Sequence, residues 1–261
     1  MGAEMIRYST FSDKGGREVN EDKVGFTEQD GRYCFVLCDG LGGHGMGDVA
    51  SLLVCESILG TFKEGKYGSY TEFLKQAFEN AQGKLLEEQD RLSAKNKMKT
   101  TCVILTIDKA PAGSVISGDE AGDTYIGFIG DSRLYVFNDN EVVKRTLDHS
   151  VPQRLALAGQ IMEKEIRNHP DRNKVLCVLG TEWEKPGYEL LKPMAQKEIQ
   201  AFLLCSDGFW EGIEEKEMCH LLKKSDSPEE WLEQMVARIK KNNRKTLDKM
   251  DNYSAIAVWV E

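Results

Sequence analysis

Acidic residues recur in this sequence where short apolar runs begin or end, and they are its best candidates for chemistry. Six carboxylates share this position: Glu21, Asp22, Asp39, Asp131, Asp207 and Asp251. Any one of them, taken alone, is explained by a turn, because Asp and the Gly that often follows it are common turn residues. Six such residues in five separated segments are harder to explain by turns, and this favours a shared site.

The chemistry of such a cluster depends on cations. If the strand ends converge, the carboxylates would repel one another and could not stay ionised unless cations lay among them. Hard divalent ions such as Mg²⁺ or Mn²⁺ prefer carboxylate and water oxygens and need neither sulfur nor imidazole. Two such ions about 3.5–4 Å apart would hold and deprotonate a bridging water for in-line attack on phosphorus. On the assumption that the segments converge, the sequence predicts a two-metal hydrolase.

Other catalytic motifs fail on inspection. Residues 40–45 fit G-x-G-x-x-G, but the helix after them is followed by a second helix, whereas a dinucleotide site needs a strand there. Residues 60–66 resemble a Walker loop, but Tyr67 stands where the magnesium-binding Ser or Thr belongs. No cysteine has Arg six positions on, and neither G-x-S-x-G nor H-E-x-x-H occurs. Covalent catalysis therefore has no obvious candidate.

The elements that must position the carboxylates follow from the apolar patterns. The β-rich runs are residues 33–38, 101–107, 124–129, 133–137, 201–205 and 254–260. The amphipathic stretches that predict helices are residues 46–63, 70–92 and about 228–247. Helix follows helix and strand follows strand, so the pattern predicts an α+β fold with antiparallel sheet. Residues 109–123 are expected to form an exposed loop, and residues 148–180 a smaller lid-like insertion.

Composition excludes several classes of protein. The chain has 43 acidic and 34 basic residues, a net charge of −9, which argues against a nucleic-acid partner. Its longest apolar runs have six residues, whereas a membrane-spanning helix needs about 20, and no secretion signal is evident. Seven cysteines without a Cys-x-x-Cys pair and only four histidines give no zinc spacing. These features predict a cytoplasmic protein with reduced cysteines.

Five segments, in order, resemble the metal-dependent Ser/Thr protein phosphatases of the PP2C (PPM) family, in its bacterial form. They are Arg17-x-x-Asn20-Glu21-Asp22, Asp39-Gly40-Leu41-Gly42-Gly43-His44, Gly130-Asp131-Ser132-Arg133-Leu134-Tyr135, Leu204-Cys205-Ser206-Asp207-Gly208 and Asp251-Asn252. The resemblance extends from about residue 7 to 261. Residues 149–180 also resemble the flap of bacterial members. Five ordered motifs are far more specific than any one of them.

The resemblance implies a single phosphatase domain over residues 1–261, with a flap-like insertion at about 148–180. The implied fold is a four-layer α-β-β-α sandwich with two central antiparallel sheets and metals in a cleft at one end. The implied cofactors are two catalytic Mn²⁺ or Mg²⁺ ions and a third ion at a weaker site.

Site residues are carried over one by one from the resemblance. Asp22 and Asp39 would bridge or flank the two catalytic metals, with the Gly40 carbonyl as a further ligand. The second ion would be held by Asp207 and Asp251.

Three further residues have implied roles. Glu21 would act mainly through metal-bound water. Asp131, together with Asp207, matches the third and weaker metal site. Arg17 matches the arginine that grips the substrate phosphate, which suits its planar two-pronged donor.

One position departs from many eukaryotic members of the family. Leu41 stands where they have the His assigned as the acid for the leaving alkoxide, so that proton would come from a metal-bound water. His44, three residues on, is expected to start a helix and pack near the site rather than to act as this acid. The remaining histidines, His149, His169 and His220, are expected in the flap or at the surface.

The resemblance and the carboxylates together predict hydrolysis of phosphoserine and phosphothreonine on proteins without a covalent intermediate. The implied partners are phosphoproteins, including a Ser/Thr kinase or its substrates. One alternative is a catalytically weak or inactive relative that serves as a phosphoprotein-binding regulatory module, although the intact carboxylates count against it. Another alternative is a metal phosphodiesterase that acts on nucleotides, but the net charge of −9 gives this alternative no support.

Overall fold

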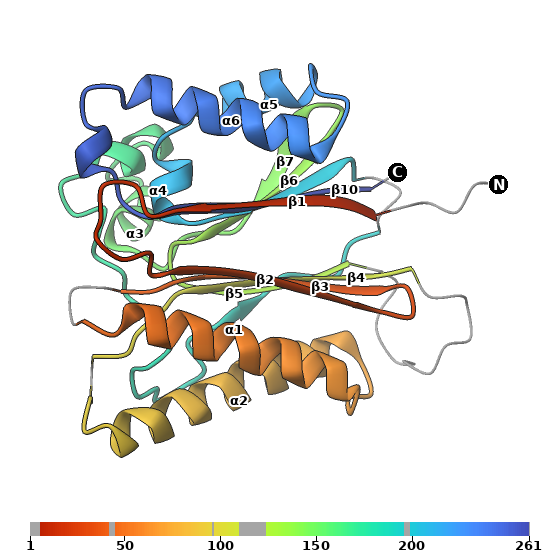
Figure 1. Ribbon diagram of the computed structural model, residues 1–261, viewed down its shortest axis with the longest axis vertical. Helices are drawn as coiled ribbons and strands as arrows, with labels where there is room; N and C mark the ends of the chain where they lie inside the picture. Colours follow the sequence, from red (N-terminus) through yellow and green to blue (C-terminus); the bar gives the residue numbers. More distant parts are fainter. Residues whose placement is uncertain (1–5, 42–44, 96, 110–123, 196–198, 261) are drawn as a thin grey trace.

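Two five-stranded antiparallel sheets stack face to face, and helices cover the outer face of each sheet (Figure 1). The computed structural model describes residues 6–41, 45–95, 97–109, 124–195 and 199–260. Sheet A has the strand order β1-β10-β9-β6-β7, and sheet B has the order β2-β3-β4-β5-β8. The predicted α+β class and the four-layer α-β-β-α arrangement are confirmed.

Most strands lie where the apolar runs predict them. Sheet A contains β1 (Ile6–Asp13), β10 (Tyr253–Val260), β9 (Ala201–Cys205), β6 (Arg133–Asn138) and β7 (Glu141–Arg145). Sheet B contains β2 (Asp22–Gln29), β3 (Arg32–Asp39), β4 (Cys102–Asp108), β5 (Thr124–Ile129) and β8 (Glu189–Leu190). The central strands are buried on both faces, and this explains why they are continuously apolar.

The core has three layers of side chains. Between the sheets, Phe35 and Leu37 of β3 pack with Phe202 and Leu204 of β9. Their neighbours in sequence, such as Val36, point to the other face and pack under α1 and α2. A third cluster fills the space between sheet A and the helices α5 and α6. This alternation is the two-residue period of a strand with both faces covered.

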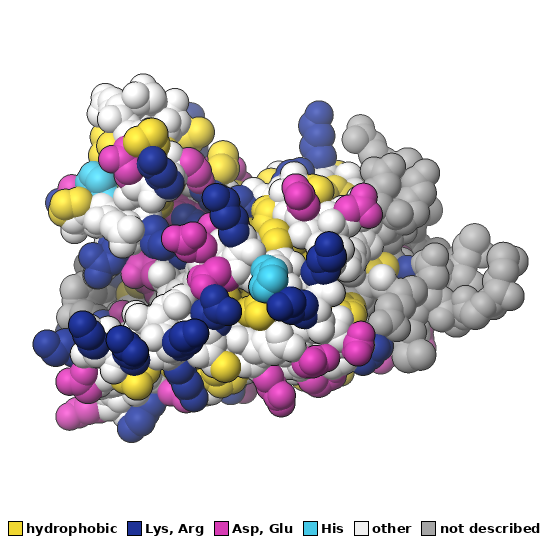
Figure 2. Space-filling view, turned by 90° about the horizontal axis from the view of Figure 1, so that it is seen from above, with side chains coloured by type: hydrophobic (Ala, Val, Ile, Leu, Met, Phe, Trp, Pro, Cys, Tyr) yellow, Lys and Arg dark blue, Asp and Glu magenta, His cyan; other side chains and the backbone are white. Residues whose placement is uncertain are grey.

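The long helices form the outer layers. α1 (Gly47–Glu64) and α2 (Tyr70–Arg91) cover sheet B, while α5 (Glu215–Leu222) and α6 (Pro228–Asn242) cover sheet A (Figure 1). Ser69 and Ser227 cap α2 and α6, each hydroxyl accepting a backbone N–H three residues on. Charged side chains of both signs cover the face above α5 and α6 (Figure 2).

Two predictions of secondary structure need correction. The helix expected over residues 228–247 ends at Asn242, because the Asn243 side chain donates to the carbonyl of Ile239 and its backbone leaves the helical region. A 3-10 turn, η4 (Leu247–Lys249), follows. β1 and β7 were not predicted, because each lies at a sheet edge and has few fully buried side chains. The loop expected at 109–123 lies, except for Lys109, outside the described residues.

Residues 148–180 form an irregular lobe beside the sheets. It contains α3 (Val151–Leu157) and the 3-10 helix η2 (Glu163–Asn168). Its two ends meet, since Ser150 bridges Val175 and the Leu176 N–H donates to the His149 carbonyl at 2.7 Å. None of the helices in the described part of the chain is both long and apolar enough to span a membrane.

Candidate active site

Strand register and topology bring five aspartates to one end of the molecule. In sheet B, Asp22 at the start of β2 lies directly opposite Asp39 at the end of β3. In sheet A, Asp207 follows β9 and Asp251 precedes its antiparallel neighbour β10. Asp131 lies between β5 of sheet B and β6 of sheet A, where the chain passes from one sheet to the other. The strand ends therefore converge.

The opposition of Asp22 and Asp39 has a local cause that the sequence analysis missed. The hairpin between β2 and β3 turns at Asp30 and Gly31, whose φ angles are 54° and 77°. Asp-Gly is a strong signal for a two-residue type I′ turn, which sets the register of the whole hairpin. With Gln29 opposite Arg32, the pairing places Asp22 opposite Asp39 seven residues away on each strand.

Glycines allow the close approach of segments around the carboxylates. Gly130 has φ 102°, and a Cβ there would lie 2.5 Å from the side chain of Thr101. The Gly40 N–H donates to the Glu21 carbonyl at 3.1 Å, and a Cβ on Gly40 would lie 2.2 Å from the carbonyl oxygen of Gly47. Side chains at these two positions would push apart the segments that carry Asp131 and Glu21.

Asn252 clamps the loop that carries Arg17 and Glu21. Its Nδ2 donates to the carbonyls of Lys14 at 2.9 Å and Val19 at 3.0 Å, and its Oδ1 accepts from the Glu21 N–H at 2.8 Å. In the sequence, Asn252 stands out only as the neighbour of Asp251. Its position before an apolar strand was the only signal, and the loop it holds lies more than 200 residues away.

Hydroxyl groups also position the carboxylates. The Ser206 Oγ of sheet A donates to Asp22 Oδ2 of sheet B at 2.8 Å. The Thr101 backbone N–H donates to the Asp39 carbonyl at 2.8 Å, and the Asp39 N–H donates to Thr101 Oγ1 at 3.2 Å. Thr101 Oγ1 also bonds to Ser132 Oγ at 2.7 Å, beside Asp131. These bonds join the segments of both sheets at the site.

Burial and mutual repulsion raise the pKa values of the aspartates. Burial raises the pKa of Asp22 to about 7. Hydrogen bonds from serines oppose this rise, and the charges of Asp207 and Asp251 add to it. Burial and the charge of Asp251 raise the pKa of Asp207 to about 6. The pKa values of Asp39 and Asp131 are raised by burial first and then by the charge of Asp207. Without cations the cluster therefore resists full ionisation near neutral pH.

The donor chemistry of this cluster fits divalent metal ions. Asp22 is 6% exposed, and its Oδ1 is buried with no hydrogen-bond partner. The aspartates and the Gly40 carbonyl offer oxygen only, which suits Mg²⁺ or Mn²⁺. Among the described residues, no group of three or more Asp, Glu, His or Cys side chains is arranged to hold a metal ion. The oxygen donors of the cluster nevertheless suit Mg²⁺, which is usually bound through one or two carboxylates and keeps several waters.

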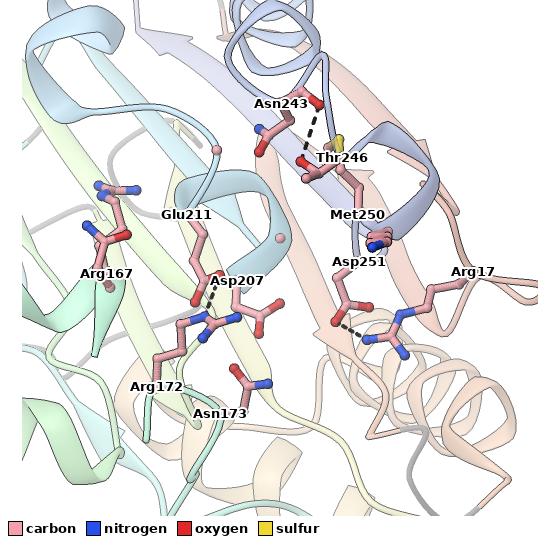
Figure 3. A pocket seen from close by; sticks show the side chains of 14 residues that line it. Arg17, Arg167, Arg172, Asn173, Asp207, Glu211, Asn243, Thr246, Met250 and Asp251 are labelled. Atoms are coloured by element: carbon pink, nitrogen blue, oxygen red, sulfur yellow. Dashed lines mark hydrogen bonds and ion pairs between the residues drawn. The ribbon is translucent and has the colours of Figure 1, made fainter. Parts of the chain in front are cut away.

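Four of the five aspartates border two adjoining cavities. The carboxylate cavity, of about 590 Å³, is lined in part by Glu21, Asp39, Gly40 and Asp131. The second, the α6 cavity, has about 480 Å³ and extends toward the end of α6 (Figure 3). Both cavities share four lining residues: Arg17, Asn173, Asp207 and Asp251.

Arg17 stands at the rim between the cavities. Its Nη2 donates to Asp251 Oδ2 at 2.6 Å, and its side chain is 58% exposed (Figure 3). Hydrogen bonding to Asp251 raises the pKa of the Arg17 guanidinium, which therefore carries its positive charge at every ordinary pH. The remaining N–H groups of this planar fork face an open cavity.

The histidines have separate positions. His44 lies outside the described residues, while Leu41 lines the carboxylate cavity. His149 begins the lobe of residues 148–180, but it is not a surface residue: its Nδ1 accepts from the Gly130 N–H at 3.3 Å and its ring packs on Phe128. His169 lies in the lobe, and His220 is exposed on α5.

Comparison with known proteins agrees with this geometry. The sequence matches the family described as protein phosphatase 2C over residues 14–250. A relative from Listeria welshimeri, named serine/threonine phosphatase stp, is 28% identical over 85% of this chain and 84% of its own.

Solved structures show the same fold. The serine/threonine phosphatase Stp1 from Staphylococcus aureus superposes with a TM-score of 0.83 at 28% identity, over 98% of this chain and 96% of that one. The catalytic domain of the phosphatase PstP, solved in complex with two manganese ions, shares the fold with a TM-score of 0.73 at 23% identity, over 98% of both chains. The chain described here belongs to the protein phosphatase 2C family.

Proposed function

We propose that this protein hydrolyses phosphoserine and phosphothreonine in proteins, with Mn²⁺ or Mg²⁺ as the cofactor. The observation that carries the proposal is the convergence of five aspartates from both sheets beside Arg17. Family membership and the names of the relatives support the same substrate class. Its substrates would include a Ser/Thr kinase or that kinase's targets, and its location would be cytoplasmic.

The proposed ligands follow the positions of the residues in the site. Asp22 and Asp39 would bridge or flank two ions, with the Gly40 carbonyl as a further ligand. Asp207 and Asp251 would hold the second ion. When bound, two divalent ions supply Lewis acidity and lower the pKa of water for in-line attack on phosphorus.

The rest of the site would support this centre. Glu21 would act mainly through metal-bound water. It is half-buried beside Gly47 and lines the carboxylate cavity together with Asp39 and Asp131. Asp131, together with Asp207, would form a third and weaker site. The charge of Asp207 raises the pKa of Asp131, which indicates that the two carboxylates interact.

Arg17 would orient the substrate phosphate. Its guanidinium is exposed, borders both cavities and presents a fork that matches two phosphate oxygens. The phosphate would compete with Asp251 for this fork, and Asp251 would then be free to contact a metal ion.

The two cysteines that lie within two residues of site aspartates in the sequence, Cys38 and Cys205, are not suited to act as a nucleophile in place of water. Cys38 and Cys205 are fully buried, and burial raises the pKa of each thiol. Hydrolysis would therefore proceed without a covalent phosphoenzyme, as in the family that the sequence resembles.

The test is turnover of a phosphothreonine peptide and of p-nitrophenyl phosphate with Mn²⁺, compared with EDTA. We expect activity only with the metal, and a loss of at least about 10³-fold in kcat when Asp39→Asn and Asp207→Asn are combined. The matched control combines Asp30→Asn with Asp139→Asn, two exposed turn residues at positive φ that Asn tolerates.

Two outcomes would overturn the proposal. The first is turnover that survives EDTA or the double substitution at Asp39 and Asp207. The second is phosphopeptide binding with no turnover in Mn²⁺, which would identify a regulatory binding module instead. The control variant has to keep its activity for either comparison to count.

A further inference from the structure

The end of α6 and the turn after it carry an unusual concentration of positive charge. Five of the ten residues from 240 to 249 are basic, against one acid, Asp248: Lys240, Lys241, Arg244, Lys245 and Lys249. We call residues 240–249 the basic segment. All five basic residues are exposed, and none takes part in an ion pair with another described residue.

Helix electrostatics explain only part of this charge. Cations are favourable in the last turn of a helix, because the helix dipole is negative there. Lys240 and Lys241 lie in that last turn. Arg244, Lys245 and Lys249 lie beyond the end of α6 at Asn242, where the dipole gives no reason for three more cations. A role in binding an anionic partner accounts for them.

The basic segment continues directly into the site. Asn243, Thr246 and Lys249 line the α6 cavity, which also contains Arg17 and Asp207 (Figure 3). In Figure 1, α6 ends at the same end of the molecule as the start of α4 (Asp207–Trp210). In Figure 2, Lys and Arg side chains gather toward this end. A peptide whose phosphoresidue lies over the aspartates would cross the α6 cavity to reach the segment.

We propose that the basic segment binds acidic residues that flank the phosphoserine or phosphothreonine of a protein substrate. This inference rests on the phosphatase activity proposed above and specifies the substrates of that site. Attraction between the basic segment and acidic residues of a substrate would speed their encounter and would favour acidic substrates over others. Its contribution to binding affinity would be smaller. The side chains are exposed, so salt should weaken the effect, because exposed charges farther apart than a Debye length, about 8–10 Å at 0.1–0.15 M salt, are largely screened.

The distribution of charge favours a short acidic peptide over a larger polyanion. The segment carries five positive charges and one negative, a net +4, so the rest of the chain carries −9 − 4 = −13. A nucleic acid or an anionic membrane would contact much of this acidic remainder and would be repelled by it. A peptide of a few residues would contact only the cavity and the segment.

The experiment replaces the four cations of the segment that do not line the cavity: Lys240→Gln, Lys241→Gln, Arg244→Gln and Lys245→Gln. Glutamine removes the charge at all four positions and keeps the helix propensity at Lys240 and Lys241, the two that lie in α6. The control replaces four exposed lysines of the α1–α2 layer with the same change of charge: Lys63→Gln, Lys66→Gln, Lys75→Gln and Lys84→Gln. Melting temperatures establish that both variants are folded.

The substrates are two phosphothreonine peptides that differ only in having Glu or Lys around the phosphoresidue, and p-nitrophenyl phosphate. For the unmodified protein with Mn²⁺ at low salt, we expect kcat/KM to be about tenfold higher for the acidic peptide. The segment variant should lose this preference through KM, and 0.5 M KCl should reduce it in the unmodified protein. Hydrolysis of p-nitrophenyl phosphate should stay within about twofold in both variants.

Each outcome separates the two proposals. No turnover of any substrate by the unmodified protein would contradict the phosphatase assignment itself. Turnover without an acidic preference, or a preference that both variants keep or lose alike, would overturn the role of the segment. Binding to phosphatidylglycerol vesicles that depends on the segment, without a peptide preference, would assign it to a membrane surface instead.

Discussion

Asp22 shows how much of the site depends on a single side chain. It belongs to sheet B, yet one of its carboxylate oxygens accepts a hydrogen bond from Ser206 of sheet A at 2.8 Å. Its other oxygen is buried with no partner, which costs free energy unless a ligand binds there. A fold stabilised only for its own sake would not keep such an oxygen at the point where two sheets meet.

Arg17 gives a sharp prediction at this scale. Arg17→Lys keeps the charge but loses the planar fork, so we expect kcat/KM for p-nitrophenyl phosphate to fall by about 10–100-fold, mostly through KM. For Arg17→Ala we expect a larger fall in kcat/KM. Steady-state kinetics at saturating Mn²⁺ measure both variants. An unchanged KM in Arg17→Ala would mean that this guanidinium does not hold the phosphate.

At the scale of elements, buried charge joins the lobe of residues 148–180 to sheet A. Arg133 of β6 donates to both oxygens of Asp148, from Nε at 2.8 Å and from Nη2 at 2.7 Å. Its guanidinium lies 3.5 Å over the ring of Trp210 in α4. Both partners of the ion pair are almost fully buried, with side-chain exposures of 4% and 1%. The pair therefore sets where the lobe begins relative to the strand that follows Asp131.

Removing this arginine should strongly destabilise the protein. Arg133→Met leaves Asp148 buried without its main partner, a change that costs about 3–5 kcal/mol in the free energy of unfolding. Denaturant titration of the metal-free protein measures this cost. Arg91→Met is the control, because Arg91 pairs with Glu88 at an exposed helix surface and should give no measurable change. Equal effects of the two substitutions would show that burial of the Arg133–Asp148 pair does not increase its contribution to the free energy of unfolding.

The lobe should influence large substrates more than small ones. Leu157 and Met162 are 67% and 56% exposed on it, so replacing both with Ser should leave the fold intact. We expect kcat/KM for a phosphoprotein to change at least about threefold more than kcat/KM for p-nitrophenyl phosphate. Leu92→Ser at the end of α2 serves as the control. Equal changes for both substrates would count against a lid beside the site.

At the scale of the whole molecule, the clustered aspartates predict how stability depends on pH. In the folded, metal-free protein the pKa of Asp22 is about 7 and that of Asp207 about 6, against an ordinary value of 3.8. Between these limits the folded state binds more protons than the unfolded state. The free energy of unfolding therefore falls as pH rises through this range.

We expect the melting temperature in EDTA to fall by at least about 3 °C between pH 6 and pH 8, which corresponds to roughly 1 kcal/mol for a chain of this size. Added Mn²⁺ at pH 8 should restore it, because the ions bind only the folded cluster. In the variant with Asp22→Asn and Asp207→Asn both effects should be smaller but not absent, because burial still raises the pKa values of Asp39 and Asp131. A melting temperature that rises with pH in the metal-free protein would contradict this account.

The sequence alone determined which side chains could bind metal, where most of the strands lie, and that Asp22 faces Asp39. The continuous apolar runs predict the central strands, because both faces of those strands are covered. The Asp30-Gly31 turn determines that Asp22 faces Asp39, since a two-residue turn leaves the hairpin only one register. The edge strands β1, β7 and β8 left weaker patterns, and they were not predicted.

Only the tertiary structure decided that the carboxylates of the two sheets meet. Asp207 follows β9 and Asp251 precedes β10, two strands that pair across about 50 residues. They approach Asp22 and Asp39 because apolar side chains of both sheets, such as Phe35 and Phe202, pack together. No short-range turn encodes that contact. It arises from burial of apolar surface summed over the whole chain, a non-directional force that local spacing does not reveal.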